Sequence, residues 1–369
     1  MWQPQGIFSE YVLRSPILLV GKEAVRGLHN FPATKIAVIH GGSFNDRDLL
    51  SSIFKKKEIA FFLRSWAGEP DLENISATLH ELESFKPDVI MAVGGGSVID
   101  GAKLCRLFYE VPYYTNMAVG NLLTTKFIAI PTTIGSGAEV SSAAVYVNRH
   151  RKEMVVIHEL QPEVVVYDES YIKTTPKNLL LSSAMDAAAH ILEGYVSNIN
   201  NSVMDINAEE GLRLLRTELY NVLQEKNISY QRLQYAGYLG GIVQNHCIVG
   251  AAHAVAHQIT QFGYSHSTAV ALLLPSVMKL NARRDTAVEE KYKNIAIAAG
   301  FEGFNGLIDF LASVNEASGV NTKKTELKNI LLQHAEDKEF IDNIKLDRGG
   351  KGNPVEITDE YISELIRSF

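Results

Sequence analysis

The chain has 369 residues, of which 46% are hydrophobic and 21% charged, and its formal net charge is −7. This composition excludes a disordered chain, which lacks the apolar residues needed to offset the entropy of ordering, and a collagen-like or coiled-coil rod. The acidic balance argues against a nucleic-acid partner, and no apolar run reaches the roughly 20 residues that span a bilayer. Cys105 and Cys247 are too few for a secreted disulfide framework, so we expect a reducing, cytoplasmic location.

The first half of the chain alternates short apolar runs with amphipathic segments. Apolar runs predict strands at 16–20, 35–39, 59–63, 88–93, 127–130 and 164–167. A helix is predicted over 71–85, where Ile75, Leu79 and Leu82 lie near one face. Fully apolar strands joined by helices are typical of a parallel sheet covered on both faces. Residues 1–175 are therefore expected to form an α/β domain with a mainly parallel sheet.

From Pro176 onward the apolar residues recur at helical spacing, and no convincing strand pattern is found. Helices are predicted at 178–197, 204–224, 231–258, 269–280, 289–299, 305–315 and 325–334. Two polar, glycine-containing segments, 318–326 and 347–354, are expected to be surface loops. We therefore expect an all-helical second domain over residues 176–369.

A glycine-rich turn, Gly94-Gly95-Gly96-Ser97, joins an apolar strand to a predicted helix. Consecutive glycines allow a ligand to approach the backbone closely, and the free N–H groups of a helix start attract an anion. The pyrophosphate of a dinucleotide would fit such a turn, with the Ser97 hydroxyl as a further donor. A tight structural turn is the alternative. Because the spacing is not G-x-G-x-x-G, an ordinary Rossmann fingerprint is not supported.

A second polar turn, residues 131–139, follows the next predicted strand and offers the hydroxyls of Thr132, Thr133 and Ser136. Ligands of parallel sheets collect beyond the carboxyl ends of the strands. The two turns could therefore face one crevice, and a solvated loop is the alternative.

Acidic and histidine side chains recur at helical spacing in the second half. Asp186 and His190 lie four residues apart among alanines, and His253 and His257 repeat that spacing, with His266 not far beyond. Buried polar groups need partners, and one carboxylate with two or three imidazoles is a suitable set for Zn²⁺ or Fe²⁺. For a single histidine a satisfied core residue is the better interpretation, whereas the whole cluster favours a metal site.

Taken together, the motifs resemble those of the iron-containing (group III) alcohol dehydrogenase family, which is related to glycerol dehydrogenases and dehydroquinate synthases. In chain order they are GGGSxxDxxK at 94–103, PTTxGTGSE at 131–139, DAxxHxxExY at 186–195, HxxAH at 253–257 with a later His266, and NPxxxT at 353–358. Ser136 and Ala138 depart from the second motif but keep that loop small.

The resemblance implies specific roles for these positions. Metal ligation falls to Asp186, His190, His253 and His266, with His257 beside the metal as the candidate for proton relay. The cofactor pyrophosphate and nicotinamide side would meet Gly94, Gly95, Gly96, Ser97 and Asp100, while Thr132, Thr133 and Ser136 would line the cleft between the domains.

The choice between NAD and NADP stays open. Many NAD-using proteins carry an acidic residue after the second strand to hold the ribose hydroxyls, whereas this chain has Gly41-Gly42-Ser43, a turn that resembles NADP-using relatives. Gln258 stands where the family often has a proline, and Ser265-His266-Ser267 replaces a common P-H-G, with one residue missing in the loop before it. The shape of the substrate pocket is therefore not predicted.

The expected reaction is hydride transfer between a small alcohol or aldehyde and a nicotinamide, with iron or zinc as Lewis acid. A homo-oligomer, a dimer, is expected. A dehydroquinate-synthase-like lyase or a glycerol-dehydrogenase-like enzyme on a polar or phosphorylated polyol is the alternative. A lyase of that kind would need lysines and arginines around the metal, and segments 186–195 and 244–266 contain none. A non-catalytic metal- or nucleotide-binding module is a third interpretation.

Overall fold

The computed structural model describes residues 15–112, 123–148 and 151–369. The chain divides into two compact units, unit 1 over Met1–Thr175 and unit 2 over Pro176–Phe369. The strands of unit 1 are β1 (Ile17–Val20), β2 (Lys35–His40), β3 (Glu58–Leu63), β4 (Val89–Gly94), β5 (Lys126–Pro131), β6 (Ala143–Asn148), β7 (Arg151–Val156) and β8 (Val164–Tyr167). Its helices are η1 (Ala24–Asn30), α1 (Arg47–Ile53), α2 (Ser76–Phe85), α3 (Gly96–Glu110), η2 (His158–Leu160) and η3 (Glu169–Tyr171).

Unit 1 is built on a six-stranded sheet in the order β1-β8-β5-β4-β2-β3, in which every pair of neighbours is parallel. The predicted strands correspond to β1–β5 and β8, which confirms the α/β class with a parallel sheet. Because β2, β4 and β5 are neighbours, the turns that follow them emerge at the same edge of the sheet.

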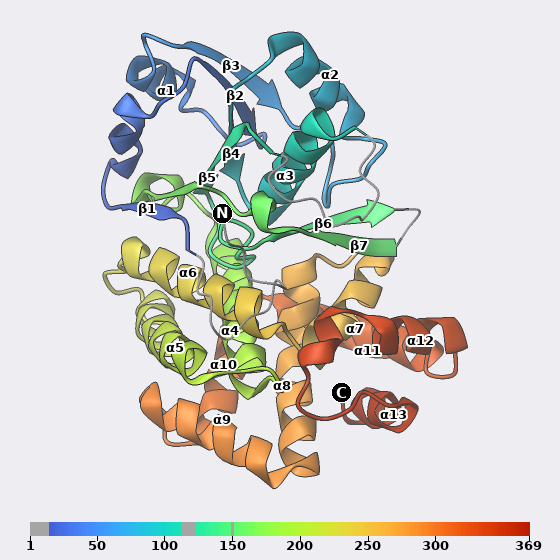
Figure 1. Ribbon diagram of the computed structural model, residues 1–369. Coiled ribbons are helices and arrows are strands. Elements are labelled where there is room, and N and C mark those ends of the chain that lie inside the picture. Colours follow the sequence, from blue (N-terminus) through green and yellow to red (C-terminus); the bar gives the residue numbers. More distant parts are fainter. Residues whose placement is uncertain (1–14, 113–122, 149–150) are drawn as a thin grey trace. The chain divides into compact units, whose positions relative to one another are not determined.

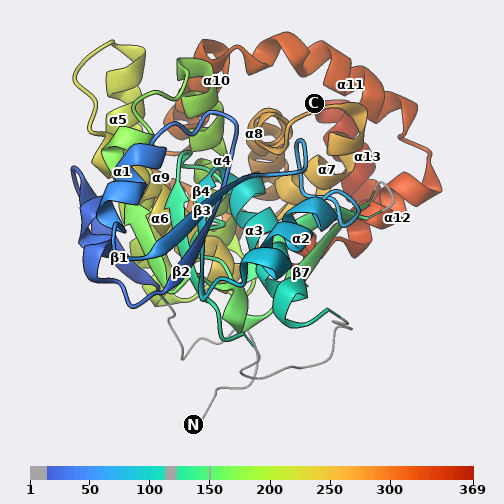
Figure 2. The same ribbon diagram turned by 90° about the horizontal axis from the view of Figure 1, so that it is seen from above.

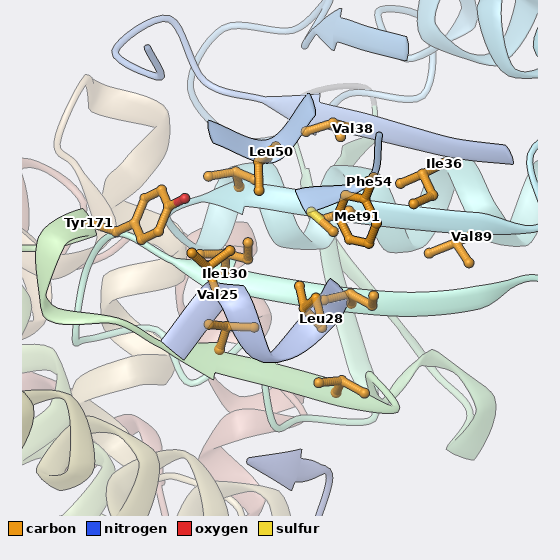
Figure 3. Packing of buried hydrophobic residues seen from close by; sticks show 14 residues of the cluster. Val25, Leu28, Ile36, Val38, Leu50, Phe54, Val89, Met91, Ile130 and Tyr171 are labelled. Carbon is orange, nitrogen blue, oxygen red and sulfur yellow. The ribbon is translucent and has the colours of Figure 1, made fainter. Parts of the chain in front are cut away.

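The two faces of this sheet are covered by different helices. Every second residue of a strand points to the same face of the sheet. On one face, Ile36 and Val38 of β2 and Met91 of β4 pack with Leu28 of η1 and Leu50 of α1 (Figure 3). Helices α2 and α3 pack on the opposite face, and Figure 2 shows α1 and α3 on opposite sides of the strands. Covering both faces explains why the strands are apolar throughout and not alternating.

Two features of unit 1 differ from the sequence prediction. A separate antiparallel pair, β6 with β7, lies in a stretch for which no strand was predicted. Strand β6 carries an apolar run, residues 143–147, that the prediction overlooked, whereas β7 begins with the charged residues Arg151, Lys152 and Glu153. Helix α2 begins at Ser76 and not at Asp71, because Asp71 forms an isolated bridge with Val147 of β6.

Unit 2, all of which the structure describes, contains helices and no strand, as predicted. Its helices are α4 (Lys177–Val196), α5 (Ser202–Leu223), α6 (Tyr230–Cys247), α7 (Ala251–Ile259), η4 (Thr260–Phe262), α8 (His266–Arg284), α9 (Thr286–Ala298), α10 (Phe304–Ser318), η5 (Val320–Lys323), α11 (Lys324–Gln333), α12 (Lys338–Leu346), η6 (Gly349–Gly352) and α13 (Asp359–Ser368). Helix α4 lies at the centre, packed against α5, α6, α8, α9 and α10 (Figure 1).

The segment 231–258, predicted as one helix, is two helices separated at Ile248. The φ of Ile248 is 59°, a left-handed conformation that a β-branched residue rarely adopts. The change in direction lets α7 start a new helix that packs against α8 and α12. Helices α12 and α13 were not predicted, although their buried residues recur at helical spacing, Phe340 and Ile344 in α12 and Tyr361, Ile362, Leu365 and Ile366 in α13.

The prediction of a surface loop over 347–354 is wrong. Gly349, Gly352 and Asn353 are buried, and this segment packs against α7. Both cysteines are buried free thiols. No helix in the described ranges is long and apolar enough to cross a membrane.

Candidate metal centre and nucleotide-binding turns

Helix α4 carries Asp186 and His190 on one face, four residues apart. Both are nearly inaccessible to solvent, at 4% and 2% exposure, because this central helix is enclosed along almost its entire length. Alanines flank them and leave room for the two polar side chains. The sequence thus places a carboxylate and an imidazole inside the helical unit, where each needs a partner.

The other histidines come from α7 and from the first residue of α8. His253 is buried on α7, and His257 follows one turn later with 19% of its side chain exposed. His266 begins α8, where the Ser265 hydroxyl accepts a hydrogen bond from the Thr268 N–H and so caps the helix. The cap fixes the direction in which the His266 side chain leaves the helix.

These side chains converge on one point within unit 2. His253 Nε2 lies 3.5 Å and His266 Nε2 3.7 Å from Asp186 Oδ1, and the ligand atoms of the three residues all lie within 4.8 Å of one another. The ring of His190 stacks on that of His253 with 4.8 Å between centroids. His257 stacks on His266 at 5.2 Å, on the outer side of the group.

The carboxylates and imidazoles of the cluster shift one another's pKa toward the charged forms. Burial raises the pKa of Asp186, but the imidazoles of His190, His253 and His266 outweigh it and hold that pKa well below its usual range. Burial lowers the pKa of His253, but the Glu193 and Asp186 carboxylates outweigh it and raise that pKa to about 9. The pocket is therefore arranged to keep the carboxylate ionised and to favour a cation beside it.

The donor set fits a divalent cation. Asp186 Oδ1 and His253 Nε2 are buried, and neither makes a hydrogen bond within the described part of the chain. Buried polar atoms without partners are rare in folded proteins. A carboxylate oxygen and imidazole nitrogens facing a common point are the ligands that Zn²⁺ and Fe²⁺ accept, and a cation there would give both atoms a partner.

Sequence reasoning missed two carboxylates that hold the histidines. Glu193 Oε2 lies 2.5 Å from His253 Nδ1, and Asp347 Oδ2 accepts a 2.8 Å hydrogen bond from His257 Nδ1. Glu193 could have been found, because it lies seven residues after Asp186 on the same face of α4. Asp347 had no such signal, since it lies in the segment that was predicted to be a surface loop.

The motif residues Asn353 and Thr358 have structural contacts. Asn353 Oδ1 accepts hydrogen bonds from the Ala251 N–H and from Asn281 Nδ2, at 3.2 and 3.1 Å. The Thr358 hydroxyl caps α13 by accepting from the Tyr361 N–H. By contrast, His246 does not join the cluster: its Nδ1 lies 2.8 Å from the Ile242 carbonyl of its own helix.

In unit 1, the glycine-rich turn after β4 lies against the polar turn after β5. A Cβ atom at Gly96 would come within 2.6 Å of Ser136 Cβ, and one at Gly95 within 3.2 Å of Thr133 Oγ1. A Cβ at Gly94 would lie 2.5 Å from Val98 Cγ2. Close packing thus accounts for Gly94, against the start of α3, and for Gly96, against Ser136, as in the tight structural turn that was the alternative to a ligand site.

The turn after β2 lies at the same edge of the sheet as the turns after β4 and β5. The Gly41 N–H donates to the Val93 carbonyl at 3.3 Å, and a Cβ at Gly41 would lie 3.6 Å from Val98 at the start of α3. Gly42 has open space at its Cβ position. Segments 41–43, 94–97 and 132–136 thus meet where β2, β4 and β5 end, the edge at which parallel sheets bind ligands.

The side chain of Ser97 is held by residues that sequence reasoning missed. Arg64, which follows β3, donates from Nη1 to the Ser97 hydroxyl at 2.8 Å, and that hydroxyl also contacts the Gly68 carbonyl. Trp66 donates from Nε1 to the Ser97 carbonyl at 3.1 Å. Arg64 brings a positive charge to the edge where an anionic ligand would bind.

Asp100 is buried one turn into α3. Its Oδ2 accepts a hydrogen bond from the Val145 N–H at 3.2 Å, and the Lys103 ammonium lies 3.9 Å from Oδ1. Burial raises the pKa of Asp100 and lowers that of Lys103. The observed contacts of this carboxylate are thus with β6 and with its own helix.

The fold and the cluster define a class of protein in which a parallel-sheet unit with glycine-rich turns precedes a helical unit with a carboxylate–histidine centre. Residues 16–169 match the family model described as iron-containing alcohol dehydrogenase, and residues 180–369 match the C-terminal model of the same family. The chain belongs to the iron-containing alcohol dehydrogenase family and is an oxidoreductase. The family expected from the motifs is thereby confirmed, and the lyase alternative is not favoured.

Individual proteins agree with this assignment. An alcohol dehydrogenase of Thermococcus barophilus is 30% identical over 81% of each chain. An NADPH-dependent butanol dehydrogenase of Clostridium saccharobutylicum is 28% identical over 88% of this chain and 87% of that one. Among solved structures, the iron-containing alcohol dehydrogenase of Thermococcus thioreducens has a TM-score of 0.87 at 26% identity, covering 96% of this chain and 98% of that one.

Proposed function

We propose that this chain transfers a hydride between a small alcohol or aldehyde and the nicotinamide of NAD or NADP, with a divalent metal held by Asp186, His190, His253 and His266. The observation that carries the proposal is the convergence of Asp186 Oδ1 with two imidazole nitrogens. Of these atoms, Asp186 Oδ1 and His253 Nε2 make no hydrogen bond with any residue that the structure describes. When bound, Fe²⁺ or Zn²⁺ supplies Lewis acidity toward the substrate oxygen, and the nicotinamide supplies the hydride acceptor.

The side chains around the centre have separate tasks in this proposal. Asp186 provides the negative charge that attracts the cation. His257, held by Asp347 through Nδ1, keeps its second nitrogen available and is partly open to solvent. We assign to His257 the relay of the proton of the substrate hydroxyl, because imidazole can donate and accept a proton near neutral pH.

Unit 1 is the proposed dinucleotide-binding domain, and unit 2 the proposed metal and catalytic domain. The pyrophosphate lies at the start of α3, against Gly94, Gly95, Gly96 and Ser97, because the first N–H groups of a helix are not used within it. Thr132, Thr133, Ser136 and Asp100 complete the cofactor contacts. Gly41, Gly42 and Ser43 face the adenosine ribose, and both cofactors remain candidates.

Two glycine substitutions test the cofactor site. Gly95→Ala is expected to fold, since the atoms nearest to its Cβ would be those of the Thr133 side chain. It is expected to weaken nucleotide binding by about 1–3 kcal/mol, the usual cost of overpacking. Gly96→Ala is expected to lower stability instead, because its Cβ would overlap Ser136. Fluorescence titration with NADH and NADPH, together with thermal unfolding, distinguishes the two effects. Gly306→Ala, in α10, is the control. Unchanged nucleotide affinity in a folded Gly95→Ala variant contradicts the proposed contact.

We further propose a cytoplasmic homo-oligomer, a dimer. Strand β1 ends the sheet order, and its Ile17 and Val20 side chains are exposed, so this edge offers a second copy of the chain a strand to pair with. Light scattering of the purified protein should give twice the mass of the 40.8 kDa chain. Replacing both residues with lysine should shift the mass toward that of one chain. A monomer in the unmodified protein contradicts the proposal.

The overall activity is tested on anaerobically purified protein loaded with Fe²⁺ or, separately, Zn²⁺. Small primary alcohols and their aldehydes are offered with each of NAD(H) and NADP(H), and nicotinamide absorbance is followed. We expect metal-dependent oxidation or reduction of at least one pair. Stoichiometric metal binding without turnover of any pair would contradict the proposed substrate class.

A further inference from the structure

A buried carboxylate outside the proposed ligand set stands behind His253. Glu193 is 2% exposed, and its two oxygens have different partners. Oε1 accepts a 2.7 Å hydrogen bond from the Ala252 N–H, in the first turn of α7, and Oε2 faces His253 Nδ1 at 2.5 Å. One side chain of α4 therefore holds both the start of α7 and the histidine on it.

The surrounding contacts leave this carboxylate little freedom. Asn353 Oδ1 accepts a hydrogen bond from the neighbouring Ala251 N–H. A Cβ at Gly250 would lie 2.9 Å from both Asn353 Oδ1 and Glu193 Oε1. Tyr361 in turn donates from its hydroxyl to Asn281 Oδ1, and Asn281 donates to Asn353. The start of α7 is thus fixed from two sides by buried hydrogen-bonding groups.

An ionised carboxylate only accepts hydrogen bonds, so the hydrogen between Glu193 and His253 must be on Nδ1 of the imidazole. In the metal-bound ring, a hydrogen kept on Nδ1 leaves the lone pair of Nε2 for the cation, and Nε2 is the atom that faces Asp186 Oδ1 and His266. We propose that Glu193 is a positioning residue that fixes the tautomer and the orientation of His253, so that Nε2 is always presented to the metal. This inference rests on the metal site of the proposed function.

Glutamine at position 193 separates this role from simple packing, because it has nearly the same shape. The amide nitrogen of glutamine is a hydrogen-bond donor, and the two groups that Glu193 contacts, the Ala252 N–H and His253 Nδ1, are donors too. One of these two groups would therefore face a donor in place of an acceptor. If the amide nitrogen faces His253, the ring must take the other tautomer, and Nε2 loses its lone pair. If the amide is turned over, its nitrogen faces the Ala252 N–H and the start of α7 loses an acceptor.

The experiment compares Zn²⁺ affinity in three proteins by competition with a chromophoric chelator. For Glu193→Gln we expect the dissociation constant to rise about 10- to 100-fold, the usual effect of removing a partner of a metal-binding histidine. The matched control is Glu218→Gln, a buried carboxylate of α5 that accepts from the Ser229 N–H in the same unit. We expect the control to bind Zn²⁺ as the parent does. Co²⁺ absorption spectra should change in Glu193→Gln alone, since its ligand arrangement is altered.

Each remaining outcome decides a different point. Unchanged Zn²⁺ affinity and an unchanged Co²⁺ spectrum in a folded Glu193→Gln variant overturn the positioning role and leave the metal site intact. A parent protein that does not bind Zn²⁺ overturns the metal site itself and this role with it. If Glu193→Gln does not fold, nitrogen NMR of the histidine-labelled zinc protein decides. A hydrogen on Nδ1 of His253 supports the proposal, and its absence there overturns it.

Discussion

Replacing Asp186 with asparagine is expected to remove the bound metal and to lower turnover at least about 10³-fold, the effect of losing several kcal/mol of Lewis-acid stabilisation. The substitution keeps the shape of the side chain but removes the only carboxylate among the proposed ligands. It also puts an amide into a pocket whose three imidazoles stabilise an anion. Metal analysis after anaerobic loading, with activity measured on the same sample, tests the expectation.

Asp186→Asn is a cleaner test than His253→Ala. Removing His253 would leave the Glu193 carboxylate buried without one of its partners, which is itself strongly destabilising. Asp168→Asn, at a buried N-cap carboxylate in unit 1, serves as the control and should keep its metal. If Asp186→Asn retains stoichiometric metal with its native affinity, the proposed ligand set is wrong.

For His257→Ala we expect the metal to stay in place and the rate to fall about 10²- to 10⁴-fold, as for the loss of a general acid–base group. His257 lies at the outer side of the cluster, stacked on His266, and its Nδ1 is already used by Asp347. Its removal takes away a proton carrier without taking away the proposed ligands. Metal content and kcat, measured together, check this.

Two other results for His257→Ala would each change its assignment. Loss of metal together with activity would mean that His257 is a ligand. Near-normal activity with metal retained would mean that it only packs against His266. Asp347→Asn is a useful companion, because it disturbs the orientation of His257 and leaves the ring present. A decrease in kcat smaller than that of His257→Ala is expected.

The sequence alone allowed the candidate metal cluster to be identified, because its members stand at helical spacing in apolar surroundings. Asp186 and His190, and likewise His253 and His257, are four residues apart, and that local repeat survives folding unchanged. Their convergence depends on α4, α7 and α8 packing together. The partners Glu193 and Asp347 are 60 and 90 residues from the histidines they contact. Contacts at such separation leave no periodic signal.

The fold shows the same division. Continuous apolar runs predicted the strands of the parallel sheet, and apolar spacing predicted most helices of unit 2. Only the tertiary structure decided where 231–258 breaks, since the positive φ of Ile248 is a conformation that its own β-branched side chain does not favour. It also buried 347–354, a polar segment whose Asp347 and Asn353 find hydrogen-bonding partners on α7. Local pattern fixes an element's type, whereas its ends and partners depend on surfaces that meet only when the chain is folded.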